Sequence, residues 1–124
     1  MIFHNAHITQ DVCLNQPKLC ERPLISPEEA TELSTLFKIF ANDNRLRLLH
    51  AMARAGEIRV VDLAAALEMK VQAVSNQLQR LANQGFVQAK REGQNIFYHI
   101  KNPCLPSILE YGLCLMEVTK KQSA

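Results

Sequence analysis

The chain has 124 residues, 48% of them hydrophobic and 6% aromatic, and such a composition can build one small core in a single domain but little more. Its longest apolar runs are far shorter than the roughly 18–20 residues that a membrane span requires, and its first residues lack the basic and apolar regions of a secretion signal, so we expect a cytoplasmic protein without a membrane segment. The formal net charge of +2 excludes no partner by itself, and in the cytoplasm the four cysteines are expected to be thiols.

The first helix has a clear start signal. Residues 1–25 show no helical period and contain two prolines, so we expect an N-terminal arm with at most a short helix, followed by a domain at 26–124. Ser26-Pro27-Glu28-Glu29 then has a serine cap, a proline at the first helical position and a glutamate three residues after the cap, which is the pattern of a capping box. The helix should end near Ala41, with an apolar stripe formed by Leu33, Leu36, Phe37 and Phe40.

A second helix is expected after the break at Asn42-Asp43-Asn44. It should run to about Ala55, with Gly56 in the closing left-handed conformation. Its candidate core residues are Leu46, Leu49 and Met52. Arg45 and Arg47 should remain available to solvent or phosphate.

The next two helices are predicted to form a helix-turn-helix. One covers about 60–67, with Val60, Leu63, Ala64 and Leu67 facing a core, and the other covers about 71–84 and is closed by Gly85. Only Glu68-Met69-Lys70 separates them, and so short a connection forces the two helices to cross steeply. The glycine that often occurs in this turn is absent.

The rest of the chain predicts a wing and a final helix. Val87 to Arg91 and Asn95 to Ile100 carry β-branched and aromatic residues around Gly93, which indicates a two-stranded hairpin. The last helix should begin at Pro103 or Leu105 and reach about Lys120. It is apolar over more of its circumference than one small core can cover, so we expect a partner copy rather than a buried helix of a monomer. Its apolar residues are Leu105, Ile108, Leu109, Leu113, Leu115, Met116 and Val118.

The predicted helix at 71–84 has the composition of a DNA-reading helix. Val71, Val74, Leu78 and Leu81 share one face, and the other faces are rich in amides and free of acids. Carboxylates are repelled by a phosphate-lined groove, whereas amides can pair with adenine edges. The stretch 70–101 as a whole holds five basic residues and one acid, while acids gather at 28–32. A polar helix and hairpin without a ligand is the alternative, but the turn spacing, the acid-free face and the basic hairpin agree with one another.

The DNA-contact candidates divide into two roles. We expect Gln72, Ser75 and Asn76 to contact bases, and the basic side chains to hold phosphates and fix the register. Binding should therefore weaken steeply with salt. The full set is Lys70, Gln72, Ala73, Ser75, Asn76, Gln77, Gln79, Arg80, Lys90, Arg91 and Gln94.

The segment Asn42 to Leu49 resembles the Asp-x-x-Arg-x-x-(Ile/Leu)-Leu segment of the ArsR/SmtB repressors. The resemblance covers about residues 26–120, and it implies a mainly α protein with a small β-hairpin, a winged helix-turn-helix that dimerises through its first and last helices. It also implies a homodimer that sits on a double-stranded operator and leaves it when an inducer binds. Gln77 and Gln94 stand where histidine and arginine are frequent, so the base preference is not carried over. Further matching segments are Asp62-Leu63-Ala64, Val74 to Leu78, Leu81, Gly85-Phe86-Val87, and Arg91 to Gln94 with Tyr98.

The metal sites of the family are not present intact. Where many members carry a Glu-Leu-Cys-Val-Cys-Asp box that binds soft metals, this chain has Glu57-Ile58-Arg59-Val60-Val61-Asp62. The zinc-sensing members place their ligands on the last helix, where Cys104 takes the place of a histidine and Asn102 that of an acidic ligand. Leu115 and Val118 replace the remaining histidine and glutamate.

The four cysteines are nevertheless candidate sensing thiols. Cys104 and Cys114 are ten residues apart, so on one helix a rise of about 15 Å separates them and each needs a ligand from elsewhere. The arm, with Cys13 and Cys20, or a second subunit can supply it. Several thiolates would favour Zn(II), Cd(II), Pb(II) or As(III) as the inducer, and His4 and His7 are weaker candidates that could complete a zinc shell.

Several alternatives remain. A cysteine on an apolar helix, such as Cys114, can simply be a small hydrophobe, whereas Cys104 sits at a helix start, where a thiolate is stabilised. The same thiols could serve a redox or reactive-sulfur switch in a repressor of the same fold. We expect no enzyme, because no cysteine has a plausible histidine and acid partner nearby. A winged helix used only for protein contacts is the last alternative, and it predicts no retention by duplex DNA.

Overall fold

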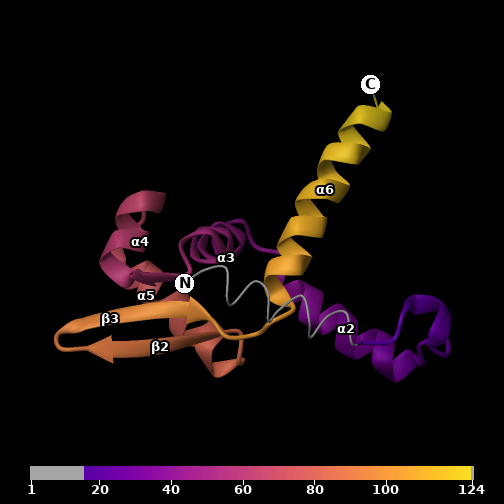
Figure 1. Cartoon of the computed structure of the whole chain (residues 1–124), viewed down its shortest axis with the longest axis horizontal. Helices are drawn as coiled ribbons and strands as arrows, with labels where there is room; N and C mark the ends of the chain where they lie inside the picture. The colour runs from indigo at the N-terminus through magenta and orange to yellow at the C-terminus, as the bar shows by residue number, and fades with distance from the viewer. Residues whose placement is uncertain (1–15, 124) are drawn as a thin grey trace.

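The computed structural model of the protein describes residues 16–123, which form mainly helices and one small antiparallel sheet (Figure 1). A short 3-10 helix precedes the first α-helix, and the predicted fold class is confirmed. Cys13, His4 and His7 lie outside the described residues. The elements are η1 (Leu19–Glu21), α2 (Pro27–Phe40), α3 (Asp43–Ala55), β1 (Glu57–Arg59), α4 (Val60–Leu67), α5 (Val71–Asn83), β2 (Val87–Glu92), β3 (Asn95–Ile100) and α6 (Leu105–Ser123).

The helix boundaries follow the cap signals of the sequence. The Ser26 hydroxyl accepts a hydrogen bond from the Glu29 amide at 3.1 Å, and the Glu29 carboxylate accepts one from the Ser26 amide at 3.0 Å. The Asn42 side chain accepts from the Arg45 amide at 3.0 Å and so caps α3. Gly56 and Gly85, which close α3 and α5, have φ values of 82° and 84°, a region that favours glycine. The capping box and the closing positions of both glycines are therefore confirmed, but Gly56, with a ψ of -65°, does not take the predicted left-handed conformation.

One core joins α3, α4, α5 and the base of the wing. Side chains from these elements are buried together, and Phe40 of α2 packs edge-to-face on Phe86 with ring centroids 5.1 Å apart. Of α6, only Leu105 at its first position belongs to the buried set. The core residues are Phe40, Leu48, Leu49, Met52, Leu63, Ala64, Val74, Leu78, Leu81, Phe86, Val87, Tyr98 and Leu105.

The sheet has the order β1-β3-β2, with β3 in the middle. The hairpin β2–β3 was predicted, whereas β1 was not. β1 pairs antiparallel with β3, placing Glu57 opposite His99 and Arg59 opposite Phe97. A three-residue strand is too short to show a period of two, and its partner lies some forty residues away, so only tertiary pairing reveals it.

Several sequence predictions need correction. Leu46 is 39% exposed and Leu48 takes its place in the core, because α3 starts at Asp43 and turns Leu48, Leu49 and Met52 inward. Arg45 donates to the Ile39 carbonyl at 2.7 Å, and Arg47 donates to the Leu67 carbonyl at 3.2 Å. These two arginines therefore tie α3 to its neighbours rather than standing wholly available to phosphate.

Three of the predicted apolar stripes, on α2, α4 and α5, are only partly covered. Phe40 of α2 is buried, but Leu33 and Phe37 are exposed, and Val71 at the start of α5 is also exposed. Val60 and Leu67 of α4 are half-buried.

Helix α6 leaves the body of the molecule at a steep angle (Figure 1). It begins at Leu105 and ends at Ser123, three residues beyond the predicted end. Most of its apolar side chains are exposed, among them Tyr111 at 75%, so the alternative of a terminal helix buried within a monomer is wrong. Within residues 16–123, no helix combines the length and the apolar character needed to cross a membrane.

Candidate nucleic-acid interface and cysteine positions

Helix α5 buries one face and presents the opposite one. Val74, Leu78 and Leu81 have no exposed surface and anchor the helix in the core. The remaining predicted contacts of the helix differ in accessibility: Gln72, Ala73, Asn76, Gln79 and Arg80 are exposed, as is Lys70 just before the helix, and Ser75 and Gln77 are half-buried. The amide-rich face therefore lies outward.

Gln77 differs from the other amides of α5. Its Oε1 is buried and has no hydrogen-bond partner among the described residues. The side chain therefore turns partly toward the protein, and it is the amide least accessible to a base edge.

Gln72 and Asn76 are joined to each other. The Gln72 Nε2 donates to the Asn76 Oδ1 at 3.0 Å, across one turn of the helix. This bond orients both carboxamides. The Gln72 Oε1 and the Asn76 Nδ2 remain to contact a base edge. Two of the three side chains predicted to read bases are thus coupled, and Ser75 is the third.

The wing carries both of its predicted cations at exposed positions, but they differ in their partners. Lys90 lies 3.0 Å from a Glu92 carboxylate oxygen and 3.9 Å from one of Glu57. The hydrogen bond to Glu92, followed by the charges of Glu57 and Glu92, raises the pKa of Lys90. The sequence did not identify Glu57 as a partner of Lys90, because it did not predict β1. Lys90 must therefore move away from two carboxylates before it can contact a phosphate. Arg91 and Gln94 are also exposed on the wing.

A second charged cluster connects α4 with the wing. The Arg59 Nε and Nη2 donate to the two carboxylate oxygens of Asp62 at 2.8 and 3.2 Å. The Arg59 Nη1 donates to the Asn95 Oδ1 at 3.3 Å. The hydrogen bond with Asp62 raises the pKa of Arg59 and lowers that of Asp62. Sequence reasoning missed this cluster, because only the Arg59–Asp62 spacing of three residues is visible without the fold.

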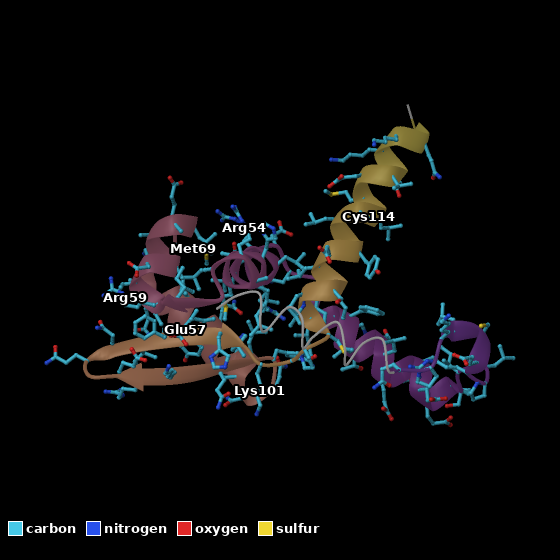
Figure 2. All side chains as sticks on the ribbon, viewed as in Figure 1. Arg54, Glu57, Arg59, Met69, Lys101 and Cys114 are labelled. Carbon is cyan, nitrogen blue, oxygen red and sulfur yellow. The ribbon has the colours of Figure 1, made fainter. Side chains whose placement is uncertain are left out.

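The described cysteines lie at three separate places. Cys20 in η1 and Cys114 on α6 are exposed, and Cys114 lies on the projecting part of α6 in Figure 2. Cys104 is half-buried at the N-cap of α6, where its amide donates to the Asn102 side chain at 3.0 Å and its carbonyl accepts from Ile108. Residues 16–123 contain no group of three or more histidine, cysteine, aspartate or glutamate side chains that could hold a metal ion.

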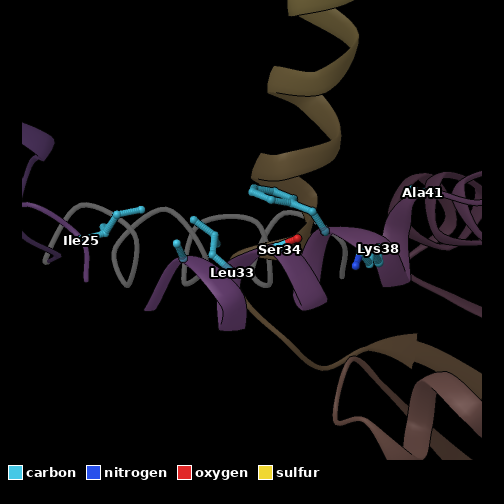
Figure 3. A pocket seen from close by; sticks show the side chains of 7 residues that line it. Ile25, Leu33, Ser34, Lys38 and Ala41 are labelled. Carbon is cyan, nitrogen blue, oxygen red and sulfur yellow. The ribbon is translucent and has the colours of Figure 1, made fainter. Parts of the chain in front are cut away.

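Two apolar depressions lie beside the helices predicted to dimerise. One, of about 310 Å³, lies between α3 and α6 and is lined by Phe40, Leu46, His50, Leu105, Ile108, Leu109, Gly112, Leu113 and Met116. The other, of about 420 Å³, follows α2 from Ile25 to Ala41 and is shallow (Figure 3). It is lined by Ile25, Ala30, Leu33, Ser34, Phe37, Lys38 and Ala41.

Comparison with known proteins places the fold among bacterial regulators. A model of the MarR family matches residues 42–95, which run from the cap of α3 to the first residue of β3 and exclude α2 and α6. The cadmium resistance transcriptional regulatory protein CadC of Listeria innocua is 27% identical over 114 residues, covering 91% of this chain and 96% of CadC. The SmtB homologue of Synechocystis, a transcriptional repressor, is 37% identical over 89 residues, covering 72% of this chain and 67% of the homologue.

Solved structures agree over a similar span. The crystal structure of the AntR antimony-specific transcriptional repressor matches with a TM-score of 0.74 and 55% identity, over 86% of this chain and 96% of AntR. The homodimeric winged helix-turn-helix DNA-binding domain of Mb0332 from Mycobacterium bovis, a possible ArsR-family regulator, matches with a TM-score of 0.66 and 27% identity, over 82% of this chain and 95% of that domain. Such proteins regulate transcription and are not enzymes, and this chain belongs to the ArsR/SmtB family of winged helix-turn-helix transcriptional regulators.

Proposed function

We propose that the protein is a homodimeric repressor that binds double-stranded operator DNA through α5 and the wing, and that a thiophilic metal or metalloid ion bound through cysteines releases it. The observation that carries the DNA-binding part is the outward, acid-free amide face of α5 beside a basic hairpin. An α-helix fits the major groove, and two flanking cations can hold the phosphates on either side of it.

The dimer is proposed from the exposed apolar surface of α2 and α6. Phe37 is 51% and Leu115 is 69% exposed in the single chain, and both depressions described above adjoin these helices. A contiguous apolar surface of this kind marks an interface with another molecule. A two-fold axis between the helices would place two copies of α5 about one turn of DNA apart and would favour a palindromic operator.

The division of the chain into an arm at 1–25 and a winged-helix domain at 26–124 is also a proposal. Leu19 is 90% and Leu24 is 98% exposed, so the described part of the arm adds nothing to the core. The described part of the arm therefore has Cys20 and apolar side chains available for another subunit.

The sensor is proposed to combine thiols from more than one segment or subunit. Cys104 and Cys114 cannot share an ion within one helix, since about 15 Å of helical rise separates them. Cys114 lies exposed on α6, where a two-fold axis would bring its counterpart close, while Cys20 and Cys13 belong to the arm. Thiolate ligands fit soft ions, and His4 and His7 remain weaker candidates for completing a zinc shell.

The choice of ions to test follows from the relatives. AntR is antimony-specific and CadC is a cadmium resistance regulator, so Sb(III) and Cd(II) come first, followed by As(III), Pb(II) and Zn(II). The high identity to AntR favours a trivalent metalloid, for which three thiolates form a complete ligand set.

The test is a titration of reduced protein on a fluorescent duplex that the wild-type chain has selected from a random pool. We expect one ion class to release the DNA at near-stoichiometric amounts. Cys104→Ser should bind the duplex normally but need more ion for release. Cys20→Ser and Cys114→Ser remove the other described candidate thiols, and each of them that belongs to the sensor should raise the amount of ion needed in the same way. A complex that survives every ion under reducing conditions would refute release by metal.

A redox or reactive-sulfur switch is the second candidate. It is favoured by the exposure of Cys20 and Cys114, which leaves both thiols accessible to an oxidant. In this case two thiols would lose two hydrogens to peroxide, which is reduced to water, and would form a disulfide. Alternatively, one thiol would take the outer sulfur of a small-molecule persulfide, which would leave as a thiol, and would itself become a persulfide. Mass spectrometry of the released protein distinguishes these changes from a bound ion.

A further inference from the structure

The side chain of Arg59, which is labelled near α4 and the wing in Figure 2, joins the helix-turn-helix to the wing through hydrogen bonds to Asp62 and Asn95. We propose that Arg59 is a positioning residue: through Asp62 and Asn95 it fixes the wing relative to α4 and α5, so that DNA binding depends on Arg59 without a DNA contact of its own. The inference rests on the proposed DNA binding.

The geometry of the guanidinium supports a structural clamp. Arg59 is the last residue of β1 and the N-cap of α4, and Asp62 lies in the first turn of that helix. Two nitrogens of Arg59 meet the two carboxylate oxygens of Asp62, a bidentate arrangement that fixes the plane of the guanidinium. A third nitrogen is left to reach Asn95 on the second wing strand. Asp62 thus orients Arg59, and Arg59 holds Asn95.

The position of Asn95 on the wing explains why this contact matters. β1 ends at Arg59, which pairs with Phe97, so the backbone support from β1 stops there. Asn95 lies two residues closer to the hairpin turn, where β2 and β3 have only each other as backbone partners. A two-stranded hairpin alone is marginally stable in water. The Arg59–Asn95 bond extends the support of the wing beyond the last strand pair.

The consequence concerns the fit to DNA. Arg91 and Gln94 on the wing and the amides of α5 must contact one duplex together, because phosphate contacts set the register in which bases are read. A wing that tilts about its base no longer presents its contacts at the required distance from α5. Three nitrogens of the Arg59 guanidinium donate hydrogen bonds within the protein. The loss of Arg59 should therefore change DNA affinity through the orientation of the wing.

The experiment measures affinity as a function of salt for the full-length variants Asn95→Ala and Arg59→Ala. A residue that contacts a phosphate contributes about 0.9 to the slope of log affinity against log salt, whereas a positioning residue contributes nothing. We expect Asn95→Ala to weaken binding about three- to tenfold with an unchanged slope. The double variant should be no weaker than Arg59→Ala alone, because both changes break the same link. Gln88→Ala, which removes an exposed amide elsewhere on the wing, is the matched control and should bind like the wild type.

Hydrogen exchange gives a readout that does not depend on DNA. The amides of β3 near Ile96 should exchange faster in Asn95→Ala, while those of α3 should not change. If Asn95→Ala leaves the affinity and the exchange of β3 unchanged, the inference is overturned although the DNA binding stands. A drop of the slope by about one in Arg59→Ala alone would also overturn it, since Arg59 would then be a phosphate contact. If the wild type binds no duplex, the proposed function fails first.

Discussion

The turn between α4 and α5 offers a sharp test of the local physics, because a glutamate occupies a position suited to glycine. Glu68 has φ 54° and ψ 46°, in the left-handed region. Its amide donates to the Ala65 carbonyl at 3.2 Å and the Met69 amide donates to the Ala64 carbonyl at 2.9 Å, which together form a Schellman motif. Glycine is the usual residue at this position of the motif, since it has no Cβ to clash there.

Replacing Glu68 by glycine should stabilise the protein. A residue with a Cβ loses about 1–2 kcal/mol in the left-handed conformation. Glycine removes this cost but adds conformational entropy to the unfolded chain, worth about 0.4–1 kcal/mol. The net gain is about 0.5–1 kcal/mol in the free energy of unfolding, or roughly 2–5 °C in the melting temperature of a domain of this size.

The assay is urea unfolding followed by circular dichroism at a fixed protein concentration, so that any dimer contributes equally. Glu68→Ala is the control, because it removes the carboxylate but keeps the Cβ, and it should show no comparable gain. DNA affinity should change less than about twofold in both variants, because the turn keeps its shape. An equal gain in both variants, or a loss in Glu68→Gly, would refute the backbone argument and point to the charge of the side chain.

Three further predictions concern the charges and amides of the reading side. Glu92→Gln removes the closest carboxylate from Lys90 and a repulsion from DNA, so anisotropy titrations should show about two- to fivefold tighter binding to every duplex; weaker binding would contradict this. Asp62→Asn should lower the free energy of unfolding at neutral pH, and its difference from the wild type should shrink as the pH falls below about 4. The reason is that the adjacent guanidinium lowers the folded-state pKa of Asp62, and this stabilisation is lost when the carboxylate is protonated. Urea midpoints measured at neutral pH and below about pH 4 check this prediction, and a constant difference would count against it. Arg91→Ala should weaken binding to all duplexes and reduce the salt slope by about one, whereas Gln72→Ala should change the preference among duplexes; uniform losses from both would refute the division of roles.

The sequence was sufficient to predict the helices, since their ends are local. Ser26 and Asn42 accept the amide hydrogens they were expected to accept, and Gly56 and Gly85 close α3 and α5. Local signals failed where a tertiary partner decides the structure. β1 exists because β3 lies beside it, and without β1 neither Glu57 beside Lys90 nor the Arg59 link to the wing could be predicted.

The phase of α3 shows a second limit. Leu46, Leu48 and Leu49 are all leucines within one turn, and composition alone does not say which of them faces inward. The structure buries Leu48 and Leu49, while Leu46 lines the depression beside α6. The cysteines show a third limit, because ligands that come from a second subunit have no signature in the spacing along one chain.

The outward face of α5 is the central claim, and chemical-shift mapping of the isotope-labelled protein with an added duplex tests it most directly. The account predicts that, at low salt, the largest amide shifts fall in Val71–Asn83 and in the hairpin of β2 and β3, and that Leu19–Glu21 and the second half of α6 change little. Shifts concentrated on α2 and α6 with α5 unaffected, or no shifts with any duplex, would contradict it.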